Sequence, residues 1–307
     1  MMERTKELWK QEGALFTGLG EVLFDMLPEG PRLGGAPANF AWTVHAMGGR
    51  ALVVSAVGDD ELGREAAALL AEKELPAELF TVPQGTGHVD VSLDAGGVPS
   101  YRFAADPAYE ALPWTERTAR AAARTAVCCF GTLARYGAVT RDTAARFLQA
   151  MPAGSFRVYD VNLRGTFYTP ELVEESLAMA DAVKCNEDEL PVLCRFAGIA
   201  EPSPEAYFRY LRLRGARCFI YTEGAVRSTV FLDGEKSVRP TPPVEVADTV
   251  GAGDAFTGAF MAALARDLPL GEAHAFAAAA ASFVCTRSGA MPDYPASFRQ
   301  TLEGAGL

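Results

Sequence analysis

A carboxylate follows two closely spaced glycines in the segment DTVGAGDAFTGAFMAAL, residues 248–264. Gly251 and Gly253 lack a β-carbon, so the chain can turn sharply here and bring its backbone close to a bound group. Apolar residues then recur at helical spacing, which predicts a helix that begins at about Gly253 or Asp254. The start of a helix presents unpaired N–H groups and the positive end of the helix dipole, and both favour an anion. Asp254 adds a second negative charge beside that anion, which costs free energy unless the carboxylate takes part in the chemistry.

A second glycine pair occurs towards the other end of the chain, in GGAPANFAWTVHAMGG, residues 34–49. Asn39 falls inside the first turn of a predicted helix there. Taken alone, Asn39 favours a helix cap, and the GAG at 251–253 fits a tight turn equally well. Two common phosphate-binding motifs, GxxxxGK[ST] and GxGxxG after a strand, do not occur in the sequence. The chemistry must therefore be inferred from the two glycine stretches together.

In order and separation, the two stretches resemble the two signatures of the ribokinase-like (PfkB-type) family of carbohydrate kinases. The resemblance extends from about residue 14 to about residue 293. Four further motifs lie between or beside the signatures: GEVLFDMLP at 20–28, DVNLR at 160–164, NEDE at 186–189 and TRSGA at 286–290. Within the family, GEVLFDMLP followed by GGAPAN is most similar to the fructokinases.

The resemblance implies that Asp254 is the catalytic base, which takes the proton from a sugar hydroxyl as that hydroxyl attacks the γ-phosphate of ATP. It also implies that the backbone amides of Ala252, Gly253 and Asp254 hold the transferring phosphoryl group, while Gly251 permits the turn. Preorganised donors suit this transfer because its charge spreads over the equatorial oxygens. A simple helix cap is the alternative role for Asp254.

The resemblance implies an acceptor site in which a carboxylate and an amide bind neighbouring sugar hydroxyls and two glycines let the backbone approach the ring. The residues concerned are Asp25, Gly34, Gly35, Asn39, Arg102 and Arg164. Ribokinases and phosphofructokinases of the family tend to carry a lysine directly after the paired glycines, whereas Ala36 and Pro37 follow here. Without that cation, an unphosphorylated sugar is favoured as the substrate.

The resemblance also implies ATP and ion contacts. The positions that match ATP contacts are Asn186, Thr222, Gly224, Gly251 and Gly253. Asn186 and Glu189 match contacts to Mg²⁺, mostly through water. The region where the family often binds K⁺ corresponds to Asp248, Ser288 and Ala290. Mg²⁺ keeps much of its hydration and takes few protein carboxylates. By itself, however, NEDE after a strand fits a helix start with acidic residues in its first turn.

Apolar, β-rich runs alternate with helical stretches along most of the chain, beginning with a predicted strand over 14–27. This alternation predicts an α/β fold with a mostly parallel sheet between helices, and the resemblance implies the ribokinase-like three-layer α/β/α form. Two alternating runs around DAGG predict a hairpin. We expect segments of about 22–33 and 80–105 to form a small β-sheet lid over the site. The predicted units are an N-terminal extension, 1–13, and the kinase domain, 14–307.

The composition narrows the choice of partners and location. Lys and Arg total 28 against 39 Asp and Glu, a net charge of −11, which argues against nucleic acids or anionic membranes as partners. The first residues lack an apolar signal core, the longest apolar run (275–285) is too short to span a bilayer, and the six cysteines show no CxxC spacing. We expect a cytoplasmic protein with reduced thiols. Dimerisation through the lid is common in the family, and we expect a homodimer.

These observations predict ATP-dependent phosphorylation of D-fructose at its 6-hydroxyl, with Mg²⁺ and with K⁺ as a candidate activator. One alternative is a kinase for another sugar or sugar acid, such as ribose or 2-keto-3-deoxygluconate. A sugar-binding regulator that has lost catalysis is a second alternative, but it does not require the aspartate at 254. A dinucleotide-dependent oxidoreductase needs a glycine fingerprint after the first strand, which GLGEVLFD lacks.

Overall fold

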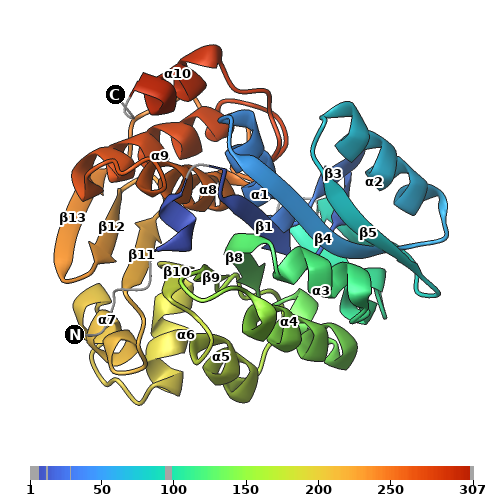
Figure 1. The fold of residues 1–307 in the computed structure, drawn as a ribbon, viewed down its shortest axis with the longest axis horizontal. Coiled ribbons are helices and arrows are strands. Elements are labelled where there is room, and N and C mark those ends of the chain that lie inside the picture. The colour runs from blue at the N-terminus through green and yellow to red at the C-terminus, as the bar shows by residue number, and fades with distance from the viewer. Residues whose placement is uncertain (1–6, 12, 28, 94–98, 305–307) are drawn as a thin grey trace.

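A nine-stranded sheet forms the centre of the protein, seen in a computed structural model that describes residues 7–11, 13–27, 29–93 and 99–304 (Figure 1). The strand order is β13-β12-β11-β10-β9-β8-β1-β4-β5, and only the β11–β12 and β12–β13 pairs of this sheet are antiparallel. The strands are β1 (Leu15–Leu19), β4 (Arg50–Gly58), β5 (Ala77–Val82), β8 (Thr125–Gly131), β9 (Phe156–Asp160), β10 (Ala182–Asn186), β11 (Cys218–Glu223), β12 (Arg227–Leu232) and β13 (Glu235–Pro240). The predicted, mostly parallel sheet is confirmed.

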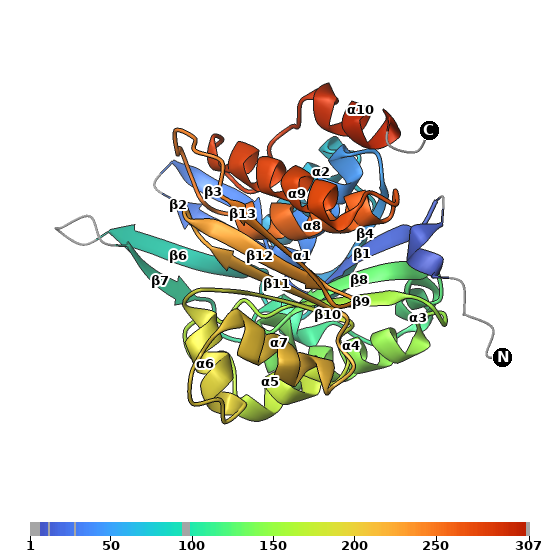
Figure 2. The same ribbon diagram turned by 90° about the vertical axis from the view of Figure 1, so that its left-hand side faces the viewer.

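Helices cover both faces of this sheet, so the three-layer prediction is also confirmed (Figure 2). One layer contains α1 (Ala36–Ala46), α2 (Glu61–Glu72), α8 (Ala252–Leu264) and α9 (Leu270–Cys285), and α10 (Ala296–Gly304) lies on the same side. The other contains α3 (Glu116–Ala122), α4 (Ala138–Ala150), α5 (Pro170–Leu177), α6 (Glu189–Phe196) and α7 (Pro204–Arg212). Short 3₁₀ turns are η1 (Leu8–Lys10), η2 (Ala108–Ala111) and η3 (Ala134–Tyr136). Across the described segments, no helix combines the length and apolar character needed to cross a bilayer.

A second, four-stranded sheet lies beyond the carboxyl ends of the central parallel strands, and we call it the lid (Figure 2). Its order is β3-β2-β6-β7, built from β2 (Leu23–Leu27), β3 (Gly30–Gly34), β6 (Gly87–Leu93) and β7 (Pro99–Phe103). The predicted small sheet is thus present. The predicted DAGG turn, 94–97, lies outside the described residues.

The expectation of one strand over 14–27 is wrong, because this run divides between the two sheets. At Gly20 the backbone has φ +145°, a conformation that residues with a β-carbon rarely adopt. The chain there leaves β1 of the central sheet and enters β2 of the lid. Periodicity missed the break because both halves of the run are apolar.

The described part of the predicted extension, residues 7–11 and 13, packs on the main domain. Trp9 is 2% exposed, and its ring centroid lies 5.0 Å from that of Phe156 in β9. The Leu8 amide donates to the Gly154 carbonyl at 3.0 Å. These contacts join η1 to the amino-terminal edge of the sheet, opposite the lid.

Candidate active site

The start of α8 is the first structural feature of the site. Gly251 precedes the helix with φ +79°, and a β-carbon there would lie 2.4 Å from Cβ of Ala290. Only glycine tolerates both this conformation and this close approach. The helix begins at Ala252, slightly before the expected start, and Asp254 lies in its first turn.

Asn39 and Asp254, which are 215 residues apart, are in direct contact. The Asn39 Nδ2 donates to the Asp254 Oδ2 at 2.8 Å, joining the first turn of α1 to that of α8. Asn39 is only 3% exposed, and its Oδ1 is buried without a hydrogen-bond partner among the described residues. The predicted acceptor-binding amide and the predicted base therefore share one point at the carboxyl edge of the sheet.

The surroundings of Asp254 raise its pKa to about 6. Burial has the largest effect, and the negative charge of Asp160 adds to it, while Lys184, Asn39 and Arg164 act in the opposite direction. A carboxylate with this pKa is largely ionised at neutral pH and is a stronger base than a carboxylate in water.

Asp25 reaches the site from the lid strand β2. A β-carbon on Gly34 would lie 3.4 Å from the Asp25 Oδ2, so the carboxylate lies beside the glycine pair. Burial and the charge of Asp248 raise the Asp25 pKa, whereas Arg164 lowers it. Arg164 has an exposed side chain, and its positive charge lowers the pKa of both Asp25 and Asp254.

The backbone at Gly35 is as constrained as the backbone at Gly251. Gly35 has φ +114°, and a β-carbon there would lie 2.3 Å from the carbonyl oxygen of Glu21. The Glu21 side chain is 2% exposed, and its Oε2 is buried without a partner in the described structure. Burial raises its pKa to about 7, and the charge of Asp254 contributes. The sequence analysis did not identify Glu21, because nothing in the segment GLGEVLFD indicates that its carboxyl group is buried.

Lys184 is a further site residue that sequence reasoning missed. Its Nζ lies 3.1 Å from the Asp160 Oδ1, and both side chains are nearly fully buried. A β-carbon on Gly253 would lie 2.6 Å from the same Nζ, so the ammonium group packs against the backbone that precedes Asp254. Burial lowers the pKa of Lys184, but Asp160, Asp254 and Glu189 together raise it above its ordinary value. The available signal was a lysine inside the otherwise apolar strand AVKCN, where an unpaired charge is costly.

Asn186 and Glu189 of the NEDE motif form a reciprocal pair at the end of β10. The Asn186 Oδ1 accepts from the Glu189 amide at 2.9 Å, and the Glu189 Oε2 accepts from the Asn186 amide at 2.9 Å. The Glu189 Oε1 accepts from the Leu163 amide at 2.8 Å. Both carboxylate oxygens thus accept backbone amides, one from the end of β10 and one from the loop after β9. The described residues contain no cluster of three His, Cys, Asp or Glu side chains that could hold a metal ion.

The other predicted nucleotide residues lie at the same edge of the sheet. Thr222 of β11 is paired with Asn186 of the neighbouring β10. Gly224 follows with φ +46°, and a β-carbon there would lie 2.9 Å from the Glu187 Oε1. The Thr241 Oγ1 donates to the Gly224 carbonyl at 2.8 Å. The order of the strands therefore brings these residues together, although they are far apart in the sequence.

The predicted K⁺ residues are brought together by two adjoining loops. The Asp248 Oδ1 accepts from the Val250 amide and its Oδ2 from the Gly289 amide, both at 3.0 Å. Ala290 packs against Gly251, and the Ser288 Oγ accepts from the guanidinium of Arg32 in the lid. Asp248 thus holds the loop before α8 to the TRSGA loop.

Arg102 is the one predicted acceptor residue that the structure does not bring to the others. Asp25 and Phe103 both lie opposite Val89, so their side chains share one face of the lid. Arg102 precedes Phe103 in β7 and therefore lies on the opposite face of the lid, since side chains alternate along a strand. There it is 84% exposed and forms an ion pair with Asp90 at 3.3 Å.

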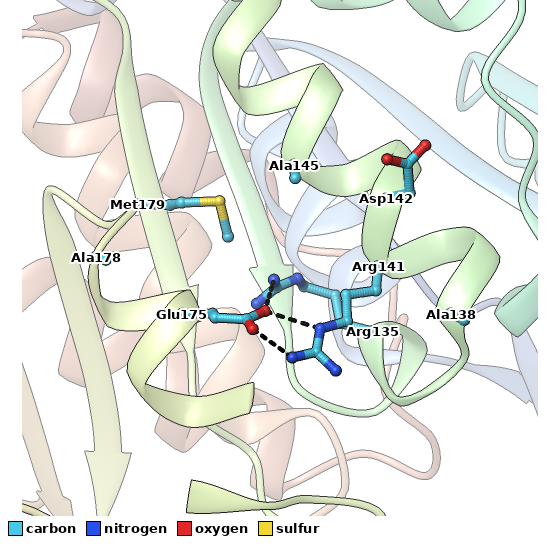
Figure 3. A pocket seen from close by; sticks show the side chains of 8 residues that line it. All are labelled: Arg135, Ala138, Arg141, Asp142, Ala145, Glu175, Ala178 and Met179. Carbon is cyan, nitrogen blue, oxygen red and sulfur yellow. Dashed lines mark hydrogen bonds and ion pairs between the residues drawn. The ribbon is translucent and has the colours of Figure 1, made fainter. Parts of the chain in front are cut away.

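A groove of about 440 Å³ lies away from this edge, between α4 and α5 (Figure 3). Arg141 forms two hydrogen bonds with Glu175, and the buried Arg135 approaches the same carboxylate at 3.8 Å. No predicted site residue lines this groove. Glu175 pairs with both arginines that line the groove, and Asp142 pairs with Arg146 outside it.

Comparisons with known proteins identify the family of this chain. A family model described as pfkB family carbohydrate kinase matches residues 31–297. Fructokinase-1 of Oryza sativa subsp. japonica is 30% identical over 309 residues, which cover 92% of this chain and 94% of that protein.

Two solved structures are similar in fold. The fructokinase of Xylella fastidiosa with bound ATP has a TM-score of 0.82 at 23% identity, covering 94% of this chain and 98% of that one. A fructokinase double mutant of Vibrio cholerae O395, with fructose, ADP and potassium ion bound, has a TM-score of 0.79 at 22% identity, with the same coverage of both chains.

Proposed function

This chain belongs to the pfkB family of carbohydrate kinases, and from that membership we propose that it transfers the γ-phosphate of ATP to the 6-hydroxyl of D-fructose. The observation that carries the proposal is the 2.8 Å hydrogen bond between Asn39 and Asp254. It joins an amide suited to sugar hydroxyls with a carboxylate suited to removing their proton. If Asn39 and Asp254 were only helix caps, neither would need the other as a partner.

In the proposed reaction, the sugar oxygen attacks the γ-phosphorus while Asp254 takes the hydroxyl proton. The bond from the γ-phosphorus to the bridging oxygen breaks, and its electron pair leaves with ADP. Asp25 and Asn39 orient the acceptor. The amides at the start of α8 face the phosphoryl oxygens, and the buried Lys184 ammonium beside Gly253 adds positive charge where negative charge develops.

The donor set at Asn186 and Glu189 fits Mg²⁺ only through water. Both Glu189 oxygens already accept a backbone amide, but each keeps a lone pair that a bound water can use. When bound, the ion neutralises charge on the phosphates. For K⁺, the fit rests on the Asp248 carboxylate, which holds the loop before α8 to the TRSGA loop. The cytoplasmic location and the homodimer through the lid stay predictions.

A sugar panel tests the proposal. Fructose, ribose, glucose and 2-keto-3-deoxygluconate are each supplied with ATP and Mg²⁺, ADP release is followed, and ³¹P NMR identifies the phosphorylated hydroxyl. We expect the highest kcat/KM for fructose and a signal at its 6-position. If the kcat/KM for fructose lies far below that for another sugar, the fructose assignment is wrong but the assignment as a sugar kinase stands. If no sugar raises the rate of ADP release above the rate measured with the Asp254→Asn variant, the proposed chemistry is wrong.

A further inference from the structure

An aromatic contact joins the lid to the body of the protein. The Phe103 ring, at the end of lid strand β7, lies 5.2 Å from the Phe167 ring, centroid to centroid. The Phe167 ring in turn meets the edge of Tyr136 in η3, at 5.5 Å and an interplanar angle of 87°. Phe103 shares its face of the lid with Asp25, because both lie opposite Val89. The contact therefore borders the acceptor side of the site.

Phe167 belongs to the same loop as Arg164, and that loop has an unusual backbone. Asn162 has φ +42° and Gly165 has φ +50°, so two of the residues that flank Arg164 are left-handed. For an asparagine this conformation costs free energy, which contacts elsewhere must offset. The Phe167 amide donates to the Arg164 carbonyl at 3.0 Å and closes the turn.

The loop is held at both of its ends. On the nucleotide side, the Val161 amide donates to the Lys184 carbonyl at 3.0 Å and the Leu163 amide to Glu189 at 2.8 Å. On the acceptor side, the Phe167 ring is the anchor to the lid. Arg164 lies between these anchors in the sequence, its side chain is exposed, and its charge lowers the pKa of both Asp25 and Asp254. Because few contacts hold this side chain itself, the conformation of the turn decides which region its guanidinium can reach.

We propose that Phe167 is a positioning residue: seated between Phe103 and Tyr136, its ring fixes the turn that directs Arg164 to the acceptor site. The acceptor site is then complete only when the lid is seated on the body. This inference rests on the proposed function, because it assigns Arg164 to the sugar. Nucleotide binding does not depend on the ring, since the other end of the loop is tied separately to Lys184 and Glu189.

Phe167→Leu tests this role by keeping an apolar side chain while removing the ring. We expect the KM for the acceptor sugar to rise about tenfold, the loss of roughly one charged hydrogen bond, with kcat changed less than about threefold. The Kd of a non-hydrolysable ATP analogue, measured without sugar, should stay within about twofold. Phe167→Tyr keeps the ring and should restore most of the KM.

Phe208→Leu is the matched control. Phe208 is also a ring in an aromatic contact, with Phe231 of β12 at 4.7 Å, but it lies in α7 of the helical layer and its aromatic partners are outside the loop that carries Phe167. It should leave the acceptor KM unchanged. The double variant Phe103→Leu/Phe167→Leu should be no worse than Phe167→Leu, because both changes break one contact. Additive effects, an unchanged KM in folded Phe167→Leu, or a parallel rise in nucleotide Kd would each overturn the proposal.

Amide hydrogen exchange separates this inference from the proposed function. In Phe103→Leu, the amides of residues 162–168 should exchange faster while those of the central strands keep their protection. Unchanged exchange in the loop contradicts the positioning role whether or not the wild-type protein phosphorylates fructose. Failure of the wild-type protein to phosphorylate any sugar, with faster loop exchange in the variant, contradicts only the proposed function.

Discussion

Asp254 stands among charges of both signs at the start of α8. Burial and Asp160 disfavour its ionised form, while Lys184, Arg164 and the Asn39 amide favour it. The balance leaves a carboxylate that is ionised at neutral pH but holds a proton more tightly than aspartate in water does. This balance suits a group that must accept a proton from an alcohol and release it after each turnover.

Asp254→Asn tests this role directly. The substituted amide oxygen can still accept from Asn39, so the local structure should persist while the base is lost. We expect kcat to fall by about 10²-fold or more, the usual range for losing general-base help, with the Kd of an ATP analogue unchanged. Near-normal turnover in steady-state assays would refute the assignment of Asp254 as the base.

The dependence of activity on pH follows from two raised carboxyl pKa values, about 6 for Asp254 and about 7 for Glu21. Because the base must be ionised, kcat/KM should fall as the pH decreases through about 6. Glu21 has the higher pKa and is therefore mostly protonated over this limb, so Glu21→Gln should leave the midpoint of the limb near pH 6. A profile that is flat from pH 5 to 8, or a large shift of the limb in Glu21→Gln, contradicts this account.

The same two groups link pH to the stability of the fold. Their folded pKa values lie above the ordinary carboxyl value, so the stability they contribute is fully present below about pH 4 and is lost as the pH rises through 6 to 7. Asp254→Asn should therefore lose less stability than the wild-type protein between pH 4 and pH 8. Urea denaturation at several pH values measures this difference. If the free energy of unfolding changes equally with pH in the two proteins, the prediction is contradicted.

At the scale of elements, the start of α8 depends on the TRSGA loop that packs against it. Gly251→Ala forces a β-carbon into a left-handed position and against Ala290. We expect the free energy of unfolding to fall by about 2 kcal/mol and kcat to fall as the backbone donors shift. Urea denaturation and steady-state turnover measure these two effects.

Gly271→Ala is the control for this change. Gly271 lies in α9, where an added β-carbon would meet only the end of the Arg239 side chain at 3.6 Å, an ordinary contact. That variant should be neutral or slightly more stable, since alanine favours helix. If Gly251→Ala behaves in the same way, the proposed strain at residue 251 is absent.

The sequence predicted the elements well where periodicity and glycine placement act locally. It failed where residues far apart in the chain decide the outcome. The run 14–27 divides between two sheets because β1 and β2 have different partners, and Arg102 turns away because its face depends on the register of β6 and β7. The pairing of Lys184 with Asp160 likewise depends on which strands are neighbours.

At the scale of the molecule, a net charge of −11 coexists with a site that must bind polyphosphate. One cation is placed individually at the start of α8, where the buried Lys184 ammonium packs against Gly253. Specific placement is sufficient because a partly buried charge acts over a short distance with little screening. The negative surface elsewhere is consistent with a small-molecule substrate.

The proposed separation of the acceptor-binding and nucleotide-binding regions predicts how each ligand stabilises the protein. In the proposed function, Asp25 of the lid and Asn39 of α1 bind the acceptor, whereas the residues proposed to bind the nucleotide lie at the ends of β10 and β11. A ligand that binds only the folded state stabilises it by about 2.7 kcal/mol at 100 times its Kd. We therefore expect a non-hydrolysable ATP analogue and fructose each to raise the Tm of the wild-type protein.

Asp25→Ala should abolish the shift with fructose and leave the shift with the ATP analogue intact. The substitution removes a carboxylate whose ionised form its surroundings already disfavour, so the unliganded protein should remain as stable as the wild type. Differential scanning fluorimetry with each ligand alone measures all three expectations. Loss of both shifts in a folded Asp25→Ala protein would mean that the lid carboxylate supports the nucleotide side as well, contrary to the separation of the two binding regions.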